Sequence, residues 1–173
     1  MLDLTRLPES ELSAFVARQP WFRAHGREGA EARVIEATFV HTVAPLLAIA
    51  LVAVATERGL NEIYQLPVGL RPEFDRAHLA AAIASLDGWT AYDALADPDL
   101  AYELVDLVRT AASAHTDTAA VEFQPVLGPD LVPPLASAGL RAIGEGHSNS
   151  SVVVKPNLAA SPPDFSQRPE PFE

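Results

Sequence analysis

The sequence predicts an α+β fold, in which a helix and a meandering antiparallel sheet are followed by a helical segment and a second small antiparallel sheet. Three observations predict this fold. Strand-like runs gather between residues 31 and 70, helical patterns between 76 and 115, and short strand-like pieces follow. Runs of strands that are separated from runs of helices are typical of α+β proteins.

The first element is expected to be a helix. After Pro8, the run ESELSAFVARQ places Leu12, Phe15 and Val16 on one face, at spacings of three and four residues. Pro20 is expected to end this helix, because the residue before a proline disfavours the helical conformation.

Three strands are expected next. The runs 31–40 and 62–70 favour strands through their β-branched and aromatic residues, and the run 46–56 is almost continuously apolar. Such a run is typical of a central strand covered on both faces, and its small side, Ala48 and Ala50, would let a helix or a partner lie close. Pro67 cannot donate a ladder hydrogen bond, so the third strand is expected to lie at an edge or to end there.

Two more helices are expected after these strands. Asp75 can cap a helix over RAHLAAAIASL, and Gly88 can end it. Asp97 followed by Pro98 predicts the start of a second helix, which would run to residue 115. Its apolar stripe would hold Leu100, Leu104, Val108 and Ala111.

The last part of the chain predicts short strands and a tail. The strand-like pieces are AAVEFQPV, GLRAIG and SSVVVK, and five prolines follow within residues 156–173. We expect a first subdomain over residues 1–74, a second over 75–155, and a proline-rich disordered tail over 156–173.

Charge and composition exclude several classes of partner. The formal net charge is −11, from 23 acidic and 12 basic residues. Such a surface repels phosphate backbones and anionic lipids, so we expect neither a nucleic-acid nor a membrane partner. The most apolar run, residues 43–55, is shorter than the roughly 20 residues that a bilayer-spanning helix needs. The sequence has no cysteine, which excludes disulfides and fits a cytoplasmic protein.

The pattern of ionisable residues indicates no metal or cofactor site. The five histidines are scattered, and no H-x-x-x-H or H-E-x-x-H spacing occurs. Acidic pairs such as Asp97 with Asp99 fit the starts and solvated faces of helices. We therefore expect no metal and no cofactor, and we assign no catalytic residue.

Four segments of the sequence resemble a known family. They are, in chain order, FVARQPWFRAHGRE, IYQLPVGL, AAIASLDGWTAYDALADP and EGHSNSSVVV. The first resembles the opening helix and Arg-Gln-x-Trp signature of actinobacterial maltokinases, the kinases that make maltose 1-phosphate from maltose and ATP. The others are similar to that family's Tyr-Gln-Val-x-Val-Gly strand, Asp-Ala-Leu segment and Glu-Gln-Ser-Asn-Thr-Ser-Val turn, and all four stand in family order.

The resemblance implies a cap subdomain, with a helix on a curved antiparallel sheet of cystatin-like topology, and then the start of a kinase N-lobe. In the family, the serine-rich turn lies over the phosphates of ATP. The positions that match it here are Ser148, Asn149, Ser150 and Ser151. The alternative interpretation, which we favour, is a hairpin turn in which these side chains form local backbone hydrogen bonds.

The sequence departs from the family after this turn. In the family a second strand carries the lysine that holds the phosphates, whereas here Lys155 follows the valines at once and Pro156 interrupts any ladder behind it. The family's His-Gly-Asp and Asp-Phe-Glu segments do not occur in this sequence. Because phosphoryl transfer needs several converging charged groups, we expect no kinase activity from this chain alone.

The segment QPWFRAHGR offers a candidate contact surface. Trp21 and Phe22 are expected to lie in the core. The alternative is that Trp21, Arg23 and Arg27 form a partner-binding surface, because tryptophan and arginine are favoured at interaction hot spots. The resemblance implies such a partner, since the cap of maltokinases is thought to help contact a trehalose synthase.

These features predict a non-catalytic binding or regulatory module in maltose, trehalose or α-glucan metabolism. Its expected partner is a sugar kinase lobe, a trehalose synthase or another α-glucan enzyme. The alternative is the N-terminal part of an ATP-dependent sugar kinase that another chain completes. The proline-rich tail, which stands where a kinase would have its lysine strand, favours the first hypothesis. A small-ligand or protease-inhibitor role would rest on cystatin-like topology alone and has little weight.

Overall fold

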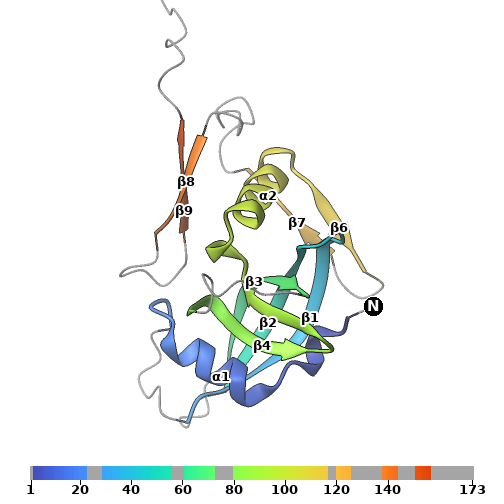
Figure 1. Ribbon diagram of the computed structural model, residues 1–173, viewed down its shortest axis with the longest axis vertical. Coiled ribbons are helices and arrows are strands. Elements are labelled where there is room, and N and C mark those ends of the chain that lie inside the picture. Colours follow the sequence, from blue (N-terminus) through green and yellow to red (C-terminus); the bar gives the residue numbers. More distant parts are fainter. Residues whose placement is uncertain are drawn as a thin grey trace, which may run out of the picture.

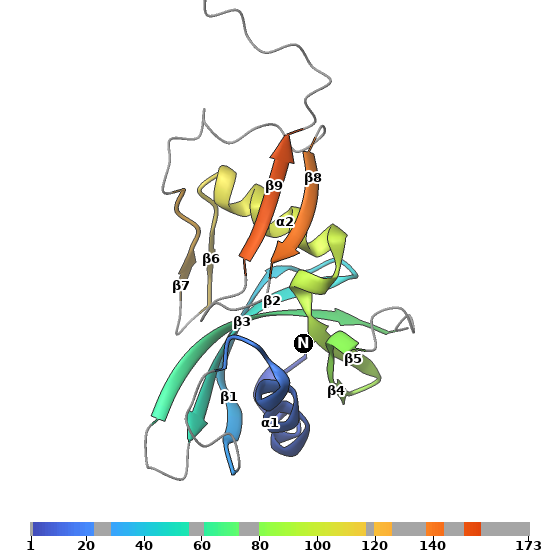
Figure 2. The same cartoon turned by 90° about the vertical axis from the view of Figure 1, so that its left-hand side faces the viewer.

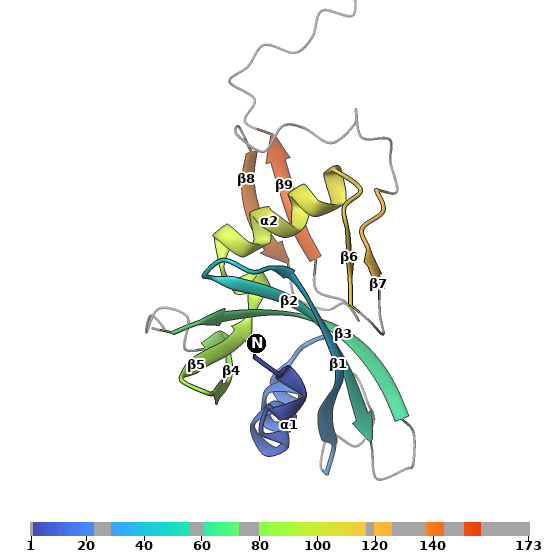
Figure 3. The ribbon, with the colours of Figure 1, turned by 90° about the vertical axis from the view of Figure 1, so that its right-hand side faces the viewer.

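A five-stranded antiparallel sheet forms the centre of the protein (Figure 1). The computed structural model describes residues 2–22, 29–55, 61–72, 80–116, 120–125, 138–143 and 151–156. Within these residues the sheet has the strand order β1-β2-β3-β5-β4, with bounds Glu31–His41, Leu46–Ala55, Asn61–Arg71, Trp89–Asp93 and Ala82–Leu86. Figures 2 and 3 show α1 (Glu9–Arg18) on one face of the sheet and α2 (Pro98–Arg109) on the other. The predicted α+β class is therefore confirmed.

Helix α1 packs its predicted apolar face against the sheet. Leu12, Phe15 and Val16 are each at most 1% exposed, and they share one core with side chains of β2. That strand contributes Ala48 and Ala50, whose small side chains were expected to let a helix lie close. The helix ends at Arg18, shortly before Pro20, as predicted.

Helix α2 closes a second core on the opposite face of the sheet. Its buried members are Leu47, Tyr92, Ala94 and Leu100. Successive residues of a strand point to opposite faces, so β2 supplies Leu47 to this core and Ala48 to the other. The near-continuous apolar run of β2 thus follows from its position between two helices.

The start of α2 is as predicted, but its end is earlier. The side chain of Asp97 accepts a hydrogen bond from the backbone N–H of Asp99 at 3.1 Å, and Pro98 is the first helical residue. The helix ends at Arg109, because Ala111 has a φ of 50° in the left-handed region and the chain then enters β6 (Ser113–His115). The predicted helix to residue 115 is therefore too long.

The predicted helix between Asp75 and Gly88 is wrong. Residues 73–79 lie outside the described residues, and the chain then forms the hairpin of β4 and β5. Asp87 and Gly88 form its turn with φ values of 48° and 82°, and positive values at both central residues are typical of the tight hairpin turn that Asp-Gly favours. Strands β3 and β5, which lie on either side of the expected boundary between residues 74 and 75 in the sequence, pair with each other.

Two small hairpins follow α2. Strand β6 pairs with β7 (Ala120–Glu122), and β8 (Ala138–Ile143) pairs with β9 (Ser151–Pro156), both antiparallel. The three short strands predicted there are confirmed. Figures 1 and 2 show β8 and β9 beside α2. Pro156, the first residue of the predicted disordered tail, is instead the last residue of β9, and the rest of that tail, residues 157–173, lies outside the described residues. No helix in the described segments has the length and apolar character needed to cross a bilayer.

Gly69 marks the closest contact between the sheet and the second core. A Cβ atom at this position would lie 2.6 Å from Cζ of Tyr92 and 2.7 Å from Cδ1 of Leu100, and both of those side chains are buried. Gly69→Ala is expected to lower the free energy of unfolding by about 2 kcal/mol, because overpacked cores cost about 1–3 kcal/mol. Urea denaturation measures this change.

The control for Gly69 is Gly88→Ala. A Cβ atom at Gly88 meets nothing within 4 Å, so this substitution carries only the cost of a positive φ. If Gly69→Ala is no more destabilising than Gly88→Ala, the close packing of Gly69 against Tyr92 is contradicted.

Candidate functional site

Only two of the residues that were predicted to contact a partner or a phosphate lie within the described residues. Trp21 is 8% exposed and belongs to the core of α1, which agrees with the core alternative for this residue. Ser151 is the first residue of β9, opposite Ile143. The other predicted site residues lie outside the described residues: Arg23, Arg27, Ser148, Asn149 and Ser150. Of the predicted residues, the described part of the structure therefore places only Trp21 and the backbone of Ser151.

A groove runs along the open edge of β3, and we call it the β3 groove. It encloses about 740 Å³ and is bordered by residues 63–67 of β3, by Leu104 and Val108 of α2, and by residues 121–124 at β7. Trp21 and Asp93 also line it. A volume of this size lies within the usual range of binding pockets.

The edge of β3 is open because β5 is short. Along its other side β3 pairs with β2 from Asn61 to Leu70, whereas β5 pairs only with Val68–Arg71. Of the residues that the structure describes, none pairs with residues 61–67 on the side away from β2. The strand does not end at Pro67, but Pro67 lies within this open part of the edge, the usual position of a proline in a sheet.

Aromatic side chains line one side of the β3 groove. The ring centroid of Tyr64 lies 5.1 Å from that of Trp21 and 6.0 Å from that of Phe22. The hydroxyl of Tyr64 donates a hydrogen bond to the Glu62 carboxylate. Burial, together with this carboxylate, raises the pKa of Tyr64 to about 12. Tyr64 therefore stays neutral at physiological pH and contributes a hydroxyl and an apolar ring to the groove.

Asp93 supplies a carboxylate at the end of the β3 groove. It is the last residue of β5, and its Oδ1 accepts a hydrogen bond from the backbone N–H of Leu95 at 3.0 Å. Burial raises the pKa of Asp93, and the hydrogen bond from Leu95 opposes this shift without cancelling it. A half-buried carboxylate with a raised pKa favours a cationic neighbour, because a nearby positive charge stabilises its ionised form.

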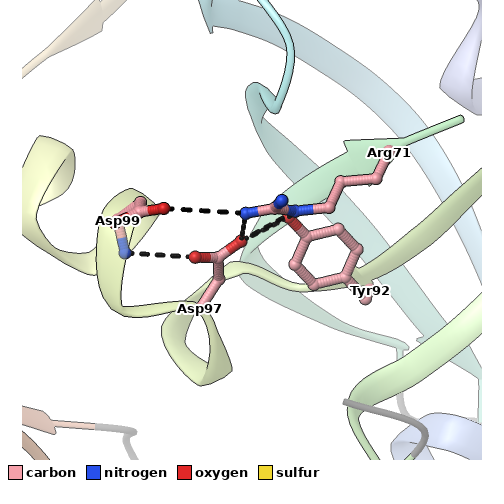
Figure 4. Close-up of polar contacts among 4 residues, drawn as sticks. All are labelled: Arg71, Tyr92, Asp97 and Asp99. Atoms are coloured by element: carbon pink, nitrogen blue, oxygen red, sulfur yellow. Dashed lines mark hydrogen bonds and ion pairs between the residues drawn. The ribbon is translucent and has the colours of Figure 1, made fainter. Parts of the chain in front are cut away.

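A second polar cluster joins β3 to the start of α2 (Figure 4). Asp97 is 2% exposed and its Oδ2 accepts hydrogen bonds from Arg71 Nη2 at 2.6 Å and from the hydroxyl of Tyr92 at 2.7 Å. Arg71 Nε also donates to Tyr92 Oη at 3.0 Å. The exposed carboxylate of Asp99 lies 3.8 Å from Arg71 Nη2. The charged groups and hydrogen-bond donors of these side chains thus find their partners mainly within the cluster.

The pKa shifts in this cluster come from its hydrogen bonds and from burial. Burial would raise the pKa of Asp97, but the hydrogen bonds from Tyr92 and Arg71 outweigh it and lower that pKa. The same contact raises the pKa of Arg71, and burial raises the pKa of Tyr92. The cluster holds a fixed ion pair at neutral pH, and it positions α2, whose Leu104 and Val108 border the β3 groove.

Sequence reasoning did not find the β3 groove or this cluster. Asp97 was interpreted as a helix cap only, and Arg71 carried no signal of its own in the sequence. The described residues contain no group of three or more His, Asp and Glu side chains that could hold a metal ion. The β3 groove combines an open strand edge with apolar and acidic side chains.

The fold defines a class: an α+β domain in which a curved antiparallel sheet lies between two helices (Figures 2 and 3). Residues 15–97 match the family model of the maltokinase N-terminal cap domain. The match begins within α1 and ends at Asp97, and it includes all five strands of the sheet. The resemblance to a maltokinase N-terminal cap that was inferred from the sequence is therefore confirmed for these residues.

Proposed function

We propose that this chain is a non-catalytic binding or regulatory module that acts on an enzyme of maltose, trehalose or α-glucan metabolism. A sugar kinase lobe and a trehalose synthase are the first partners to test, and another α-glucan enzyme is the next. The match of residues 15–97 to the maltokinase N-terminal cap domain supports this choice of partners.

The observation that carries this proposal is the open edge of β3 beside an apolar groove. Ile63, on that edge, is 65% exposed, although large apolar side chains are usually buried. An exposed strand edge with apolar side chains is a template for pairing with another chain. Both the edge and the aromatic pair of Trp21 and Tyr64 belong to the segment that matches the cap family.

The charges of the polar cluster at α2 are consistent with a structural role. The guanidinium of Arg71 is held by Asp97 at 2.6 Å and faces Asp99. A cation that clamps a transferred phosphate has to point at the nucleotide, whereas this one is bound to carboxylates of its own chain. The cluster therefore stabilises the domain, and binding remains the activity that its surface supports best.

A second candidate function has its own observation. The glycine- and serine-rich residues 144–150 connect β8 to β9, which pair from Ala138 with Pro156 to Ile143 with Ser151. A turn between two antiparallel strands is the setting in which the resembled family places its phosphate-covering turn. The alternative is therefore the N-terminal part of an ATP-dependent sugar kinase that is completed by another chain.

Phosphorylation and binding assays distinguish these two functions. With ATP, Mg²⁺ and maltose, the purified chain is expected to form no maltose 1-phosphate above background. In sedimentation experiments it is expected to bind a purified maltokinase lobe or trehalose synthase with micromolar or tighter affinity, and to change the activity of that enzyme. Turnover that is lost in Asn149→Ala or Lys155→Ala would contradict the non-catalytic function, and failure to bind either enzyme or any other purified α-glucan enzyme would contradict the binding function.

A further inference from the structure

Among the residues that the structure describes, the β3 groove has the geometry of a vacant strand position. Residues 63–67 are consecutive and all line the groove. Successive side chains of a strand point to opposite faces, so five consecutive residues can line one groove only if the backbone edge faces it. The vacant position continues the line of β5, which covers β3 only from Val68 onward.

The walls of the groove would contact both faces of an added strand. On one face lie Trp21 and Tyr64, and on the other lie Leu104 and Val108 of α2. Phe123, after β7, lines the groove as well. Because the side chains of an added strand would point alternately to these two walls, the groove favours apolar residues at most positions of its occupant.

The charge of the groove is acidic. Its ionisable acidic side chains are Asp93 and Glu122, and Glu62 lies one residue beyond the stretch of β3 that lines it. Among the described residues that line the groove there is no lysine, arginine or histidine. The whole chain has a net charge of −11, so a second copy of it would be repelled, whereas a basic segment would be attracted.

We propose that the β3 groove binds an extended segment of a partner protein, rich in apolar residues and carrying lysine or arginine, as an added strand that pairs with residues 61–66. This inference rests on the proposed function and names the surface through which that function acts. Main-chain hydrogen bonds to the edge of β3 would provide the affinity, and the two walls and Asp93 would select the side chains. The basic residue would pair with Asp93, whose Oδ1 already accepts from Leu95.

A peptide selection followed by NMR spectroscopy tests the inference. A library of random ten-residue peptides, displayed on phage, is selected against the purified full chain at low ionic strength. The expected peptides alternate apolar residues with at least one lysine or arginine. On binding of a synthetic copy, alternate backbone amides between Asn61 and Leu66 are expected to become protected from hydrogen exchange, because an added strand bonds every second residue of the edge.

Matched variants test the contacts of the bound peptide. The double variant Asp93→Asn with Glu122→Gln is expected to weaken binding roughly tenfold, and less at high salt, because it removes the opposing charges. Asn at position 93 keeps an oxygen for the N–H of Leu95. Glu11→Gln, on the exposed surface of α1, is the control and is expected to leave binding unchanged. A proline at the centre of the peptide is expected to abolish binding, because it removes a ladder hydrogen bond.

Several outcomes would overturn the inference. They are the enrichment of no peptide, the enrichment of acidic peptides, and a bound peptide that leaves the amides of 61–66 unprotected. A dimer of the chain that protects the same amides would assign the edge to a second copy instead. If a purified enzyme binds while these amides stay unchanged, the edge inference fails and the proposed function stands. If the chain phosphorylates maltose while basic peptides still protect the edge, the proposed function fails and the edge inference stands.

Discussion

Replacement of Trp21 by alanine is expected to lower the free energy of unfolding by about 3–5 kcal/mol, the usual cost of removing a buried tryptophan side chain. Trp21 is 8% exposed and its ring lies 5.1 Å from that of Tyr64, at an interplanar angle of 44°. The side chain fills the space between α1 and the open edge of β3, so its loss leaves a cavity that the neighbouring aromatic rings cannot fill. Urea denaturation followed by circular dichroism measures the change.

The second tryptophan of the chain is the matched control. Trp89 is only partly buried, at the start of β5, and Trp89→Ala is expected to be less destabilising than Trp21→Ala. A loss below about 1 kcal/mol for Trp21→Ala would contradict its assignment to the core. If such a variant keeps its stability and loses partner binding, the alternative of a contact surface at Trp21 is correct.

Replacement of Asp97 by alanine is expected to cost about 3 kcal/mol, because removal of one partner of a buried ion pair leaves the other uncompensated. Arg71 would lose a hydrogen-bond partner at 2.6 Å, and the hydroxyl of Tyr92 would lose one at 2.7 Å. Helix α2 would also lose its N-terminal cap. We place the cost at the lower end of the usual range because the side chain of Arg71 is 33% exposed and water replaces part of the interaction.

Asp99→Asn is the control for Asp97. Asp99 lies 3.8 Å from the same guanidinium but is 83% exposed, so its loss is expected to cost under about 1 kcal/mol. Equal costs for Asp97→Ala and Asp99→Asn would contradict the central role of the buried carboxylate.

The contribution of Asp97 depends on pH. Its pKa in the folded protein is lowered, so its contribution is fully present above the unfolded value, about 3.9, and is lost as the pH falls through the lower folded value. Asp97→Asn is expected to be less stable than the wild type at pH 7 and to lack this acid-side loss. Thermal denaturation between pH 2 and 7 measures the difference between the two proteins, and parallel pH profiles would contradict the lowered pKa.

Most helices and strands could be predicted because local pattern and tertiary position agree. Leu12, Phe15 and Val16 form a helical face and are buried together, and the continuous apolar run of β2 lies between two helices. The hairpin of β4 and β5 was mispredicted because residues 80–86, AAAIASL, have high helix propensity. The Asp87-Gly88 pair is instead typical of a hairpin turn. The pairing of β5 with β3 outweighs the helix propensity of this segment.

The candidate site could not be predicted because its parts are distant in the sequence. The β3 groove joins Trp21, residues 63–67, Asp93, α2 and residues 121–124. Only Trp21 drew attention beforehand, through its residue type. The groove exists because β5 pairs with four residues of β3 and leaves the rest open, and the length over which two strands pair is set by the turns and connections around them. The pattern of residue types along the chain does not predict the length over which two strands pair.

The position of Asp97 has a consequence for how this domain is inherited. It is the last residue of the segment that matches the cap family, yet its carboxylate fastens α2 to Arg71 and Tyr92. A gene rearrangement that broke the chain there would expose Leu47 and Tyr92 to water, since α2 covers them. The unit that can be transferred to another protein without such damage therefore extends at least to Arg109.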